Sequence, residues 1–138
     1  MVYGDAVMNK GELGKILYVE DDPDIQLVAK MALETIGRFS LSVCSSGQEA
    51  IDNAVGFAPD LILLDVMMPG MNGPATLTNL RAIDILHATP VIFMTANVMP
   101  VDVAHYKSLG AVDVISKPFD AVTLAQTVQE IWDRCHGR

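Results

Sequence analysis

The sequence predicts an α/β fold in which a parallel five-stranded sheet carries helices on both faces. From Lys15 onward, segments of strand type alternate with segments of helix type, as in strands joined by crossover helices. Residues 61–64 and 91–94 are apolar throughout, which is typical of strands covered on both faces. An acidic residue ends or directly follows one such run, and a hydroxyl residue follows the other. The carboxyl ends of parallel strands form the edge of the sheet where ligands bind.

The first strand and helix are indicated over residues 15–36. Residues 15–19 form a strand pattern, and Pro23 follows at a position that the first helical turn tolerates. Gly37 is a natural stop for this helix. Residues 41–44 alternate as a second strand. The apolar residues that recur at helical spacing are Ile25, Val28, Ala29, Ala32, Leu33 and Ile36.

The second helix is predicted from a capping signature. Ser45 and Gln48 have the spacing of a capping box, and Gly56 and Pro59 end the segment. The third strand, residues 61–64, follows directly. The predicted apolar face of the helix consists of Ala50, Ile51, Ala54 and Val55.

The second half repeats the same alternation. A loop rich in proline and glycine, residues 67–73, leads to a helix that turns Leu77 and Leu80 inward. The strand at residues 91–94 precedes a helix over about residues 101–109. The last strand covers residues 113–116, Asp120 caps the final helix, and its apolar stripe consists of Leu124, Val128 and Ile131.

Five strand–helix units therefore occupy residues 15 to about 134, and they predict a three-layer sandwich. Right-handed crossovers leave few arrangements, and the flavodoxin-like (βα)5 order 2-1-3-4-5 is the commonest for five units. In that order the first and third strands are neighbours, so we expect Asp21 and Asp65 to lie side by side. Residues 1–14 lack periodicity and contain three glycines; we expect a flexible N-terminal leader there and a folded domain over residues 15–138.

Composition narrows the classes of function. The net charge of −8 and pI near 4.6 disfavour nucleic acid and anionic membranes as partners. No apolar run approaches the roughly 20 residues of a membrane span, and no signal pattern opens the chain. Cys44 and Cys135 are too few for a disulfide framework and have no metal-ligand spacing. We therefore expect a cytoplasmic protein that binds neither nucleic acid nor membranes.

The acidic residues at the strand ends suit a divalent cation. Two carboxylates about 4 Å apart repel by roughly 4 kcal/mol at an effective dielectric near 20, so gathering Glu20, Asp21 and Asp65 favours bound Mg²⁺ or Ca²⁺ over zinc. A purely structural explanation is that residues 20–22 cap the following helix, and we expect Asp22 to do so. Asp65 is harder to explain that way, because it ends a run of four aliphatic residues.

The chemistry of Asp65 depends on what lies beside it. A carboxylate there can act as metal ligand, as nucleophile that forms an acyl phosphate, or as both. Lys117 supplies a point charge for a phosphate oxygen and offsets the carboxylates when no phosphate is bound. Thr95 supplies a hydroxyl donor at the mouth of the fourth strand. Each of these residues is ordinary alone, and their joint position at successive strand ends favours phosphoryl chemistry.

Four motifs in order resemble those of the response-regulator receiver domain of two-component signalling. They are ILYVEDD (16–22), LILLDVMMPGMNG (61–73), VIFMTA (91–96) and ISKPF (115–119). The resemblance covers about residues 15–134, and the separations of 44, 30 and 22 residues between Asp21, Asp65, Thr95 and Lys117 agree with it.

The resemblance implies a role for each matching residue. Asp65 is the implied phosphoacceptor, and Thr95 and Lys117 are the hydroxyl and amine that engage the phosphoryl group. The implied Mg²⁺ site, which Mn²⁺ can also fill, uses Asp21, Asp65, the backbone carbonyl of Met67 and, through water, Glu20. Ala96 is the small residue that leaves the phosphate accessible, and a cis bond before Pro118 aims Lys117 into the site.

One position departs from the family pattern. Val114 stands where the family commonly has a tyrosine or phenylalanine whose ring moves inward on phosphorylation. A valine cannot make that movement. We expect the output face to respond through a backbone shift of the loop after Thr95.

The implied function is a phosphorylatable signalling switch rather than an enzyme with turnover. It implies a histidine kinase or histidine phosphotransfer protein as phosphodonor, an unknown downstream protein target, and a monomer or weak homodimer. Its activity is limited to self-phosphotransfer and slow autodephosphorylation. Three alternatives remain: a hydrolase with an aspartyl-phosphate intermediate, which lacks a second acid because Met67 occupies that place; a nucleotide-binding flavodoxin relative, which lacks a glycine-rich loop; and a partner-binding module that works without phosphate.

Overall fold

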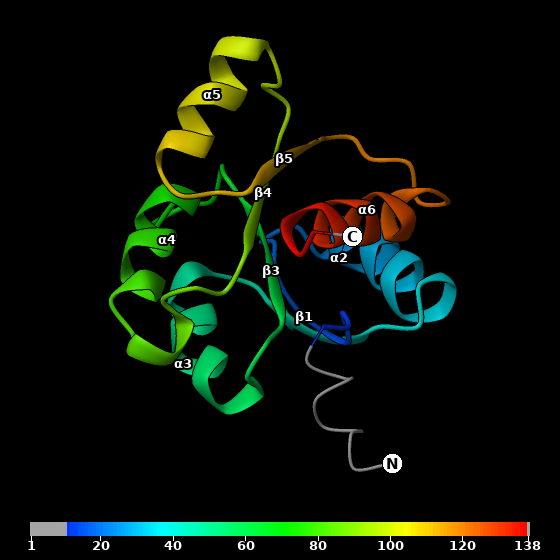
Figure 1. The fold of residues 1–138 in the computed structure, drawn as a ribbon, viewed down its shortest axis with the longest axis horizontal. Helices are drawn as coiled ribbons and strands as arrows, with labels where there is room; N and C mark the ends of the chain where they lie inside the picture. Colours follow the sequence, from blue (N-terminus) through cyan, green and yellow to red (C-terminus); the bar gives the residue numbers. More distant parts are fainter. Residues whose placement is uncertain (1–10, 138) are drawn as a thin grey trace.

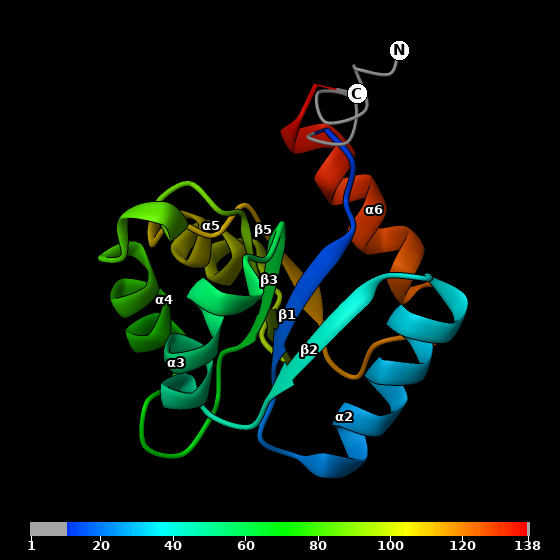
Figure 2. The same ribbon diagram turned by 90° about the horizontal axis from the view of Figure 1, so that it is seen from below.

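The computed structural model describes residues 11–137 as one parallel sheet between two layers of helices (Figure 1). The strand order β2-β1-β3-β4-β5 confirms the predicted arrangement. Every neighbouring pair is parallel, and Figure 2 shows β1 beside β2 from below. The strands are β1 (Lys15–Val19), β2 (Ser40–Cys44), β3 (Leu61–Asp65), β4 (Val91–Thr95) and β5 (Asp113–Ser116).

The helices divide between the two faces of the sheet (Figure 1). Helix α2 (Pro23–Lys30), which continues as the π-helix η1 (Met31–Ile36), lies with α6 (Leu124–Cys135) on one face. The other face carries α3 (Gly47–Phe57), α4 (Gly73–Arg81) and α5 (Pro100–Ser108). The short 3-10 helix η2 (Asp84–Leu86) precedes β4. Among the helices described over residues 11–137, none is long and apolar enough to cross a membrane.

Each face of the sheet has its own apolar core. Strand side chains alternate between faces, so Ile16 and Tyr18 belong to the core under α2 and α6, whereas Leu17 and Val19 belong to the core under α3 and α4. Strands β3 and β4 are buried along their whole length, as their uninterrupted apolar runs predict. Because these strands are buried, the residues at their ends, Asp65 and Thr95, are held in fixed positions at the edge of the sheet.

The helix starts differ in part from the sequence predictions. Asp22 caps α2 as predicted, because its Oδ1 accepts from the backbone N–H of Asp24 at 2.9 Å. The cap of α3, by contrast, is Ser46 and not Ser45: Ser46 Oγ accepts from the N–H of Glu49 at 3.1 Å. Ser45 Oγ instead accepts from the side-chain amide of Gln26 at 3.1 Å. Gly47 then opens the helix against α4, where an added Cβ would overlap Thr76 Oγ1.

The predicted cap of the last helix is also wrong. Helix α6 begins at Leu124, and Thr123 at its N-cap makes no side-chain cap hydrogen bond. Asp120 instead organises the turn ahead of the helix, where its Oδ1 accepts from the N–H of Val122 at 2.8 Å. The carbonyl of Asp120 then accepts from the N–H of Leu124 at 2.9 Å. The Asp120 carboxylate, which the sequence predicts as the cap of the helix, therefore stabilises the turn ahead of it.

The buried helix faces are narrower than the periodicity predicts. Val28, Ile36 and Val55 lie at helical spacing but are 43%, 52% and 46% exposed. The buried residues of these helices are mostly small: Ala29 in α2, Ala32 beside Leu33 in η1, and Gly47, Ala50 and Ala54 in α3. Small residues bring the helix close to the sheet, so the flanking valine and isoleucine side chains extend past the contact.

Residues 1–10 of the predicted N-terminal leader lie outside the described residues. Residues 11–14 contact the domain. The indole N–H of Trp132 donates to the carbonyl of Gly11 at 3.1 Å, Leu13 is buried in the core, and the N–H of Gly14 donates to Asp60 Oδ2 at 2.9 Å. These contacts attach the segment before β1 to both α6 and the loop before β3.

Candidate functional site

Three acidic residues meet at the carboxyl edge of the sheet. The register pairs Val19 with Leu64, which brings Glu20 and Asp21 beside Asp65. One carboxylate oxygen from each of Glu20, Asp21 and Asp65 lies within 4.8 Å of the other two. This confirms that Asp21 and Asp65 are neighbours, as the predicted strand order requires.

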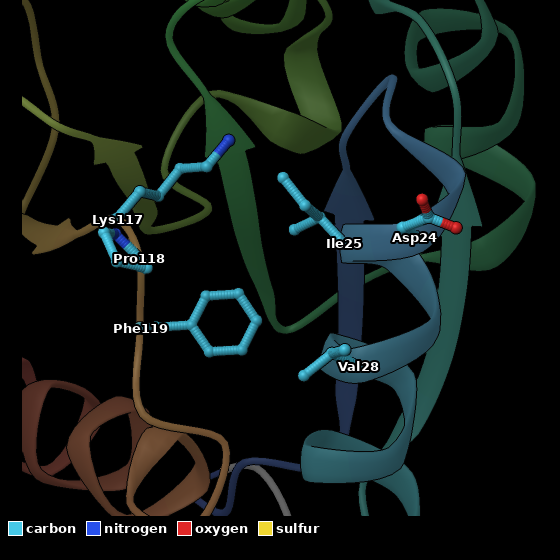
Figure 3. Close-up of a pocket in the computed structure, with 6 residues that line it drawn as sticks. All are labelled: Asp24, Ile25, Val28, Lys117, Pro118 and Phe119. Carbon is cyan, nitrogen blue, oxygen red and sulfur yellow. The ribbon is translucent and has the colours of Figure 1, made fainter.

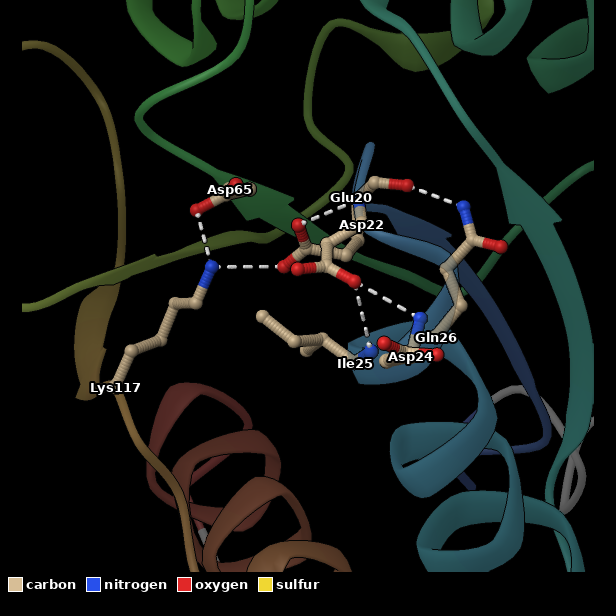
Figure 4. A network of polar contacts seen from close by, with 7 residues as sticks. All are labelled: Glu20, Asp22, Asp24, Ile25, Gln26, Asp65 and Lys117. Carbon is tan, nitrogen blue, oxygen red and sulfur yellow. Dashed lines mark hydrogen bonds and ion pairs between the residues drawn. The ribbon is translucent and has the colours of Figure 1, made fainter.

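Lys117 joins this cluster from the end of β5 (Figure 4). Its Nζ lies 2.8 Å from Glu20 Oε1 and 3.1 Å from Asp65 Oδ1. The Lys117 side chain is 19% exposed, and those of Glu20 and Asp65 are 2% and 3% exposed. The Lys117–Pro118 bond is cis. One ammonium group thus balances two nearly buried carboxylates.

The electrostatics of the site follow from burial and from this shared amine. Burial raises the pKa of Asp65 to about 6; hydrogen bonding to Lys117 opposes the rise, and the charge of Glu20 adds to it. Burial lowers the pKa of Lys117, but the hydrogen bonds to Glu20 and Asp65 outweigh it and leave that pKa raised. Lys117 therefore stays charged, whereas Asp65 is the group that the site makes harder to ionise.

This pKa predicts a pH-dependent stability in metal-free protein. Folded protein keeps a proton on Asp65 up to about pH 6, whereas an unfolded chain releases it near 3.8. The folded state binds more protons between these values, so the free energy of unfolding should fall as pH rises through this window, by on the order of 3 kcal/mol. Urea unfolding across the window measures this slope. Asp65→Asn should lack it, and parallel curves for the two proteins would contradict the prediction.

Hydrogen bonds hold the loop that carries Glu20 and Asp21. Glu20 Oε2 accepts from the backbone N–H of Asp22 at 3.1 Å, so both oxygens of this carboxylate have a donor. The side-chain amide of Gln26 donates to the carbonyl of Glu20 (Figure 4) and, at 3.1 Å, to Ser45 Oγ. Gln26 thus ties the loop after β1 to the loop after β2. Sequence reasoning missed this residue, because no pattern marks a glutamine that contacts backbone.

Thr95 lies at the same edge but outside the ion-pair network. Its side chain is buried, and its Oγ1 accepts from the N–H of Asn97 at 3.1 Å. Its carbonyl accepts from the N–H of Lys117 at 2.9 Å. The hydroxyl thus contacts the loop that follows β4, and the backbone of the same residue positions the start of the Lys117 loop.

The remaining predicted site residues surround this centre. Ala96 is exposed and the Met67 side chain is 74% exposed; the carbonyl of Met67 as a metal ligand stays a prediction. Val114 is half-buried against the core under α3 and α4, and the register pairs it with Phe93 of that core. Tyr106 of α5 packs edge-on against Phe93, with ring centroids 5.4 Å apart. The space beside Val114 therefore contains an aromatic ring from a helix.

An apolar pocket of about 280 Å³ adjoins the acidic cluster. It lies between α2 and the loop after β5, and Figure 3 shows the Lys117 stem beside it. The ammonium at the end of this stem contacts Glu20 and Asp65 (Figure 4). The stem is therefore desolvated by the pocket wall while the charge serves the carboxylates. The pocket is lined by Asp24, Ile25, Val28, Lys117, Pro118 and Phe119.

The acidic cluster has the donors of a hard divalent cation. Its potential ligand atoms are carboxylate oxygens from Glu20, Asp21 and Asp65, a set that fits Mg²⁺ or Ca²⁺ better than zinc. Asp21 is exposed, whereas Glu20 and Asp65 are buried. A cation can therefore approach from the side of the exposed Asp21.

The family comparison matches residues 16–129 to the response regulator receiver domain. The transcriptional regulatory protein CpxR of Escherichia coli is 40% identical over 124 residues, which are 90% of this chain and 51% of that protein. The transcriptional activator protein IrlR of Burkholderia pseudomallei is 37% identical, over 90% of this chain and 52% of that protein. The chain thus spans about half the length of these curated relatives.

Solved structures give the same fold. The chemotaxis response regulator CheY4 of Vibrio cholerae superposes with a TM-score of 0.79 at 28% identity, over 87% of this chain and 99% of that one. The signal receiver domain of a signal transduction histidine kinase from Syntrophus aciditrophicus gives a TM-score of 0.74 at 36% identity, over 88% and 91% of the two chains. Both neighbours therefore share the overall fold of this chain.

Proposed function

The chain belongs to the response regulator receiver domain family, and we propose that it is a signalling switch that accepts a phosphoryl group on Asp65. The observation that carries this proposal is the position of Asp65. Its carboxylate is nearly buried, lies beside two further carboxylates, and shares one ammonium group with Glu20. The carboxylates of such a site favour binding of a cation. Lys117 favours binding of a negatively charged phosphoryl group next to that cation.

The proposed reaction is a transfer from a phosphohistidine of a histidine kinase or histidine phosphotransfer protein. One carboxylate oxygen of Asp65 forms a bond to phosphorus while the phosphorus–nitrogen bond breaks, and the electron pair leaves with the imidazole nitrogen, which takes up a proton. The product is an acyl phosphate on Asp65. Positioning and charge stabilisation account for most of the catalysis in such transfers.

Asp21, Asp65 and the Met67 carbonyl are the proposed ligands of Mg²⁺, which Mn²⁺ can replace, and Glu20 is proposed to act through water. When bound, the cation supplies charge neutralisation at the phosphoryl oxygens. Lys117 then turns its ammonium from the carboxylates toward a phosphoryl oxygen, a movement that its flexible stem allows. The Thr95 hydroxyl gives up the hydrogen bond that it accepts from the N–H of Asn97 and donates one to the phosphoryl group instead. The loop after β4 moves with it. Partner proteins would read that shift in the surface.

We propose that this chain has no steady turnover of its own, only self-phosphotransfer and slow autodephosphorylation in the cytoplasm. Hydrolysis through an aspartyl phosphate needs an acid to protonate the leaving group. Met67 stands two residues after Asp65 and has no proton to give. The downstream target is proposed to be a protein.

The test is incubation with acetyl phosphate and Mg²⁺, followed by measurement of the intact mass. One phosphoryl group should appear on the unmodified protein and none on Asp65→Asn, since the amide is not a nucleophile toward phosphorus. Chelation of the cation should abolish labelling. Asp60→Asn is the matched control, because Asp60 caps the segment before β1 through backbone N–H groups and should label normally.

Two outcomes would overturn the proposal. Labelling that persists in Asp65→Asn would place the acceptor elsewhere. Continuous release of phosphate in many turnovers would show a hydrolase instead of a switch.

A further inference from the structure

One buried side-chain oxygen has no hydrogen-bond partner among the residues that the structure describes: the hydroxyl of Tyr18. The residue is completely buried in β1. A buried donor without a partner destabilises a fold, because it gives up its bond to water and gains none. A phenylalanine would fill the same space without this penalty. The unpaired hydroxyl therefore points to a partner that becomes available in another state of the protein.

The sheet places this hydroxyl under the acidic cluster. Side chains two residues apart in a strand share a face, so Tyr18 lies on the same face as Glu20. Its partner in β3 is Leu63, two residues before Asp65. Glu20 is about 6.6 Å further along the strand direction, which is close to the reach of a tyrosine side chain.

Tyr18 belongs to an apolar core. This is the core under α2 and α6, which includes Leu63, Met94 and Ile115. The polar groups at the upper edge of this core are the carboxylates of Glu20 and Asp65, and the amine of Lys117 reaches them from the end of β5. Any partner for the hydroxyl must therefore come from this cluster.

The phenol can act only as a donor there. Burial, then the charges of Glu20 and Asp65 and the approach of the hydroxyl to the Glu20 side chain, hold the pKa of Tyr18 far above its ordinary value. The hydroxyl thus lies close to Glu20 without forming a well-aligned hydrogen bond to it. In the present arrangement the Glu20 carboxylate already accepts from Lys117 at Oε1 and from the Asp22 N–H at Oε2. Glu20 thus has no need of the phenol while Lys117 stays in place.

We propose that Tyr18 is a positioning residue that donates a hydrogen bond to Glu20 when Lys117 turns to a phosphoryl group on Asp65. This inference rests on the proposed function. As the ammonium leaves, Oε1 of Glu20 loses its donor inside a nearly closed site. The Tyr18 hydroxyl takes the vacated place and holds the carboxylate in its orientation toward the cation. Formation of this bond favours the phosphorylated arrangement.

Tyr18→Phe tests this proposal, with beryllofluoride as a stable substitute for the phosphoryl group. At a fixed Mg²⁺ concentration the variant should bind beryllofluoride about 3- to 10-fold more weakly, the loss of one hydrogen bond to a carboxylate. Its unfolding midpoint in urea without ligand should equal or exceed that of the unmodified protein, because the unpaired hydroxyl is gone. Weaker binding combined with unchanged or greater stability is a pattern that a structural role would not give.

A second measurement uses the unmodified protein. Tyrosine labelled with ¹³C at Cζ reports hydrogen bonding of the hydroxyl by nuclear magnetic resonance, and the signal missing from Tyr18→Phe identifies Tyr18. This signal should move when beryllofluoride and Mg²⁺ are added. Tyr106→Phe, on α5, is the control and should bind beryllofluoride like the unmodified protein.

The outcomes separate this inference from the function on which it rests. Failure of the unmodified protein to bind beryllofluoride would overturn the proposed function. Normal binding by that protein, with an unmoved Tyr18 signal and equal affinity in Tyr18→Phe, would overturn the role of Tyr18 alone.

Discussion

Replacing Lys117 with methionine is expected to lower the free energy of unfolding of the metal-free protein by about 3–5 kcal/mol, the effect of removing one partner from a buried ion pair. Methionine preserves most of the stem that lines the apolar pocket, so packing changes little. The ammonium that serves Glu20 at 2.8 Å and Asp65 at 3.1 Å is lost. Two nearly buried carboxylates then face each other without a counter-charge.

The measurement is urea unfolding near neutral pH with chelator, then with Mg²⁺. A cation in the acidic cluster replaces the missing charge, so Mg²⁺ should stabilise Lys117→Met more than it stabilises the unmodified protein. Acidification should also restore stability, because a protonated Asp65 no longer repels Glu20. On the proposed function, the variant should form little acyl phosphate even when Mg²⁺ has restored its fold.

Lys107→Met is the matched control. Lys107 is exposed in the last turn of α5, where loss of a solvated amine should change stability by less than about 0.5 kcal/mol. If Lys117→Met were as stable as this control, and indifferent to Mg²⁺, the amine of Lys117 would not be balancing the cluster.

The strand order and the meeting of Asp65 with Lys117 could be predicted because both depend on few alternatives. The continuous apolar runs at residues 61–64 and 91–94 must be buried strands, and right-handed crossovers then leave few sheets to consider. Once the order is known, residues that follow each strand share one edge. Distance along the chain is irrelevant to that argument, so 52 residues between Asp65 and Lys117 did not obscure their contact.

The parts that escaped prediction depend on contacts between elements. Ser45 with Gln48 and Ser46 with Glu49 are equally good local signatures. In the structure Ser46 caps the helix, while Ser45 Oγ accepts from Gln26 of α2. Gln26 contacts a backbone carbonyl and a serine from another loop, which no local pattern encodes. Tyr18 lies in an apolar strand, and its sequence context indicates only a core residue. Only the position of its hydroxyl under Glu20 distinguishes it from a phenylalanine.

Gly73→Ala is expected to lower the free energy of unfolding by about 2–3 kcal/mol, the usual effect of forcing a methyl group into a closed contact. Gly73 opens α4, and its N–H donates to the carbonyl of Val66 at 2.9 Å. An added Cβ would lie 2.6 Å from the carbonyl oxygen of Asp65 and 2.8 Å from the Cα of Val66. Both are backbone atoms, so no side chain can rotate away to relieve the overlap.

The same overlap should affect the site. Relief requires either that the start of α4 moves outward or that the end of β3 moves, and the second movement displaces Asp65 from Lys117 and Glu20. The expected result is slower labelling by acetyl phosphate together with the loss of stability. Measuring the labelling rate without urea, at a temperature where the variant is still folded, separates the two effects.

Gly56→Ala provides a control with the opposite sign. Gly56 lies within α3 and nothing lies within 4 Å of the Cβ it would gain, so alanine should stabilise the helix by about 0.5–1 kcal/mol. The two glycines have the same chemistry and differ only in what surrounds them. If both variants were stabilised, the close contact between Gly73 and the backbone of Asp65 would be absent in solution, and the helix would leave the acceptor free to move. If Gly73→Ala alone is destabilised, the start of α4 is a rigid support for the residue that takes the phosphoryl group.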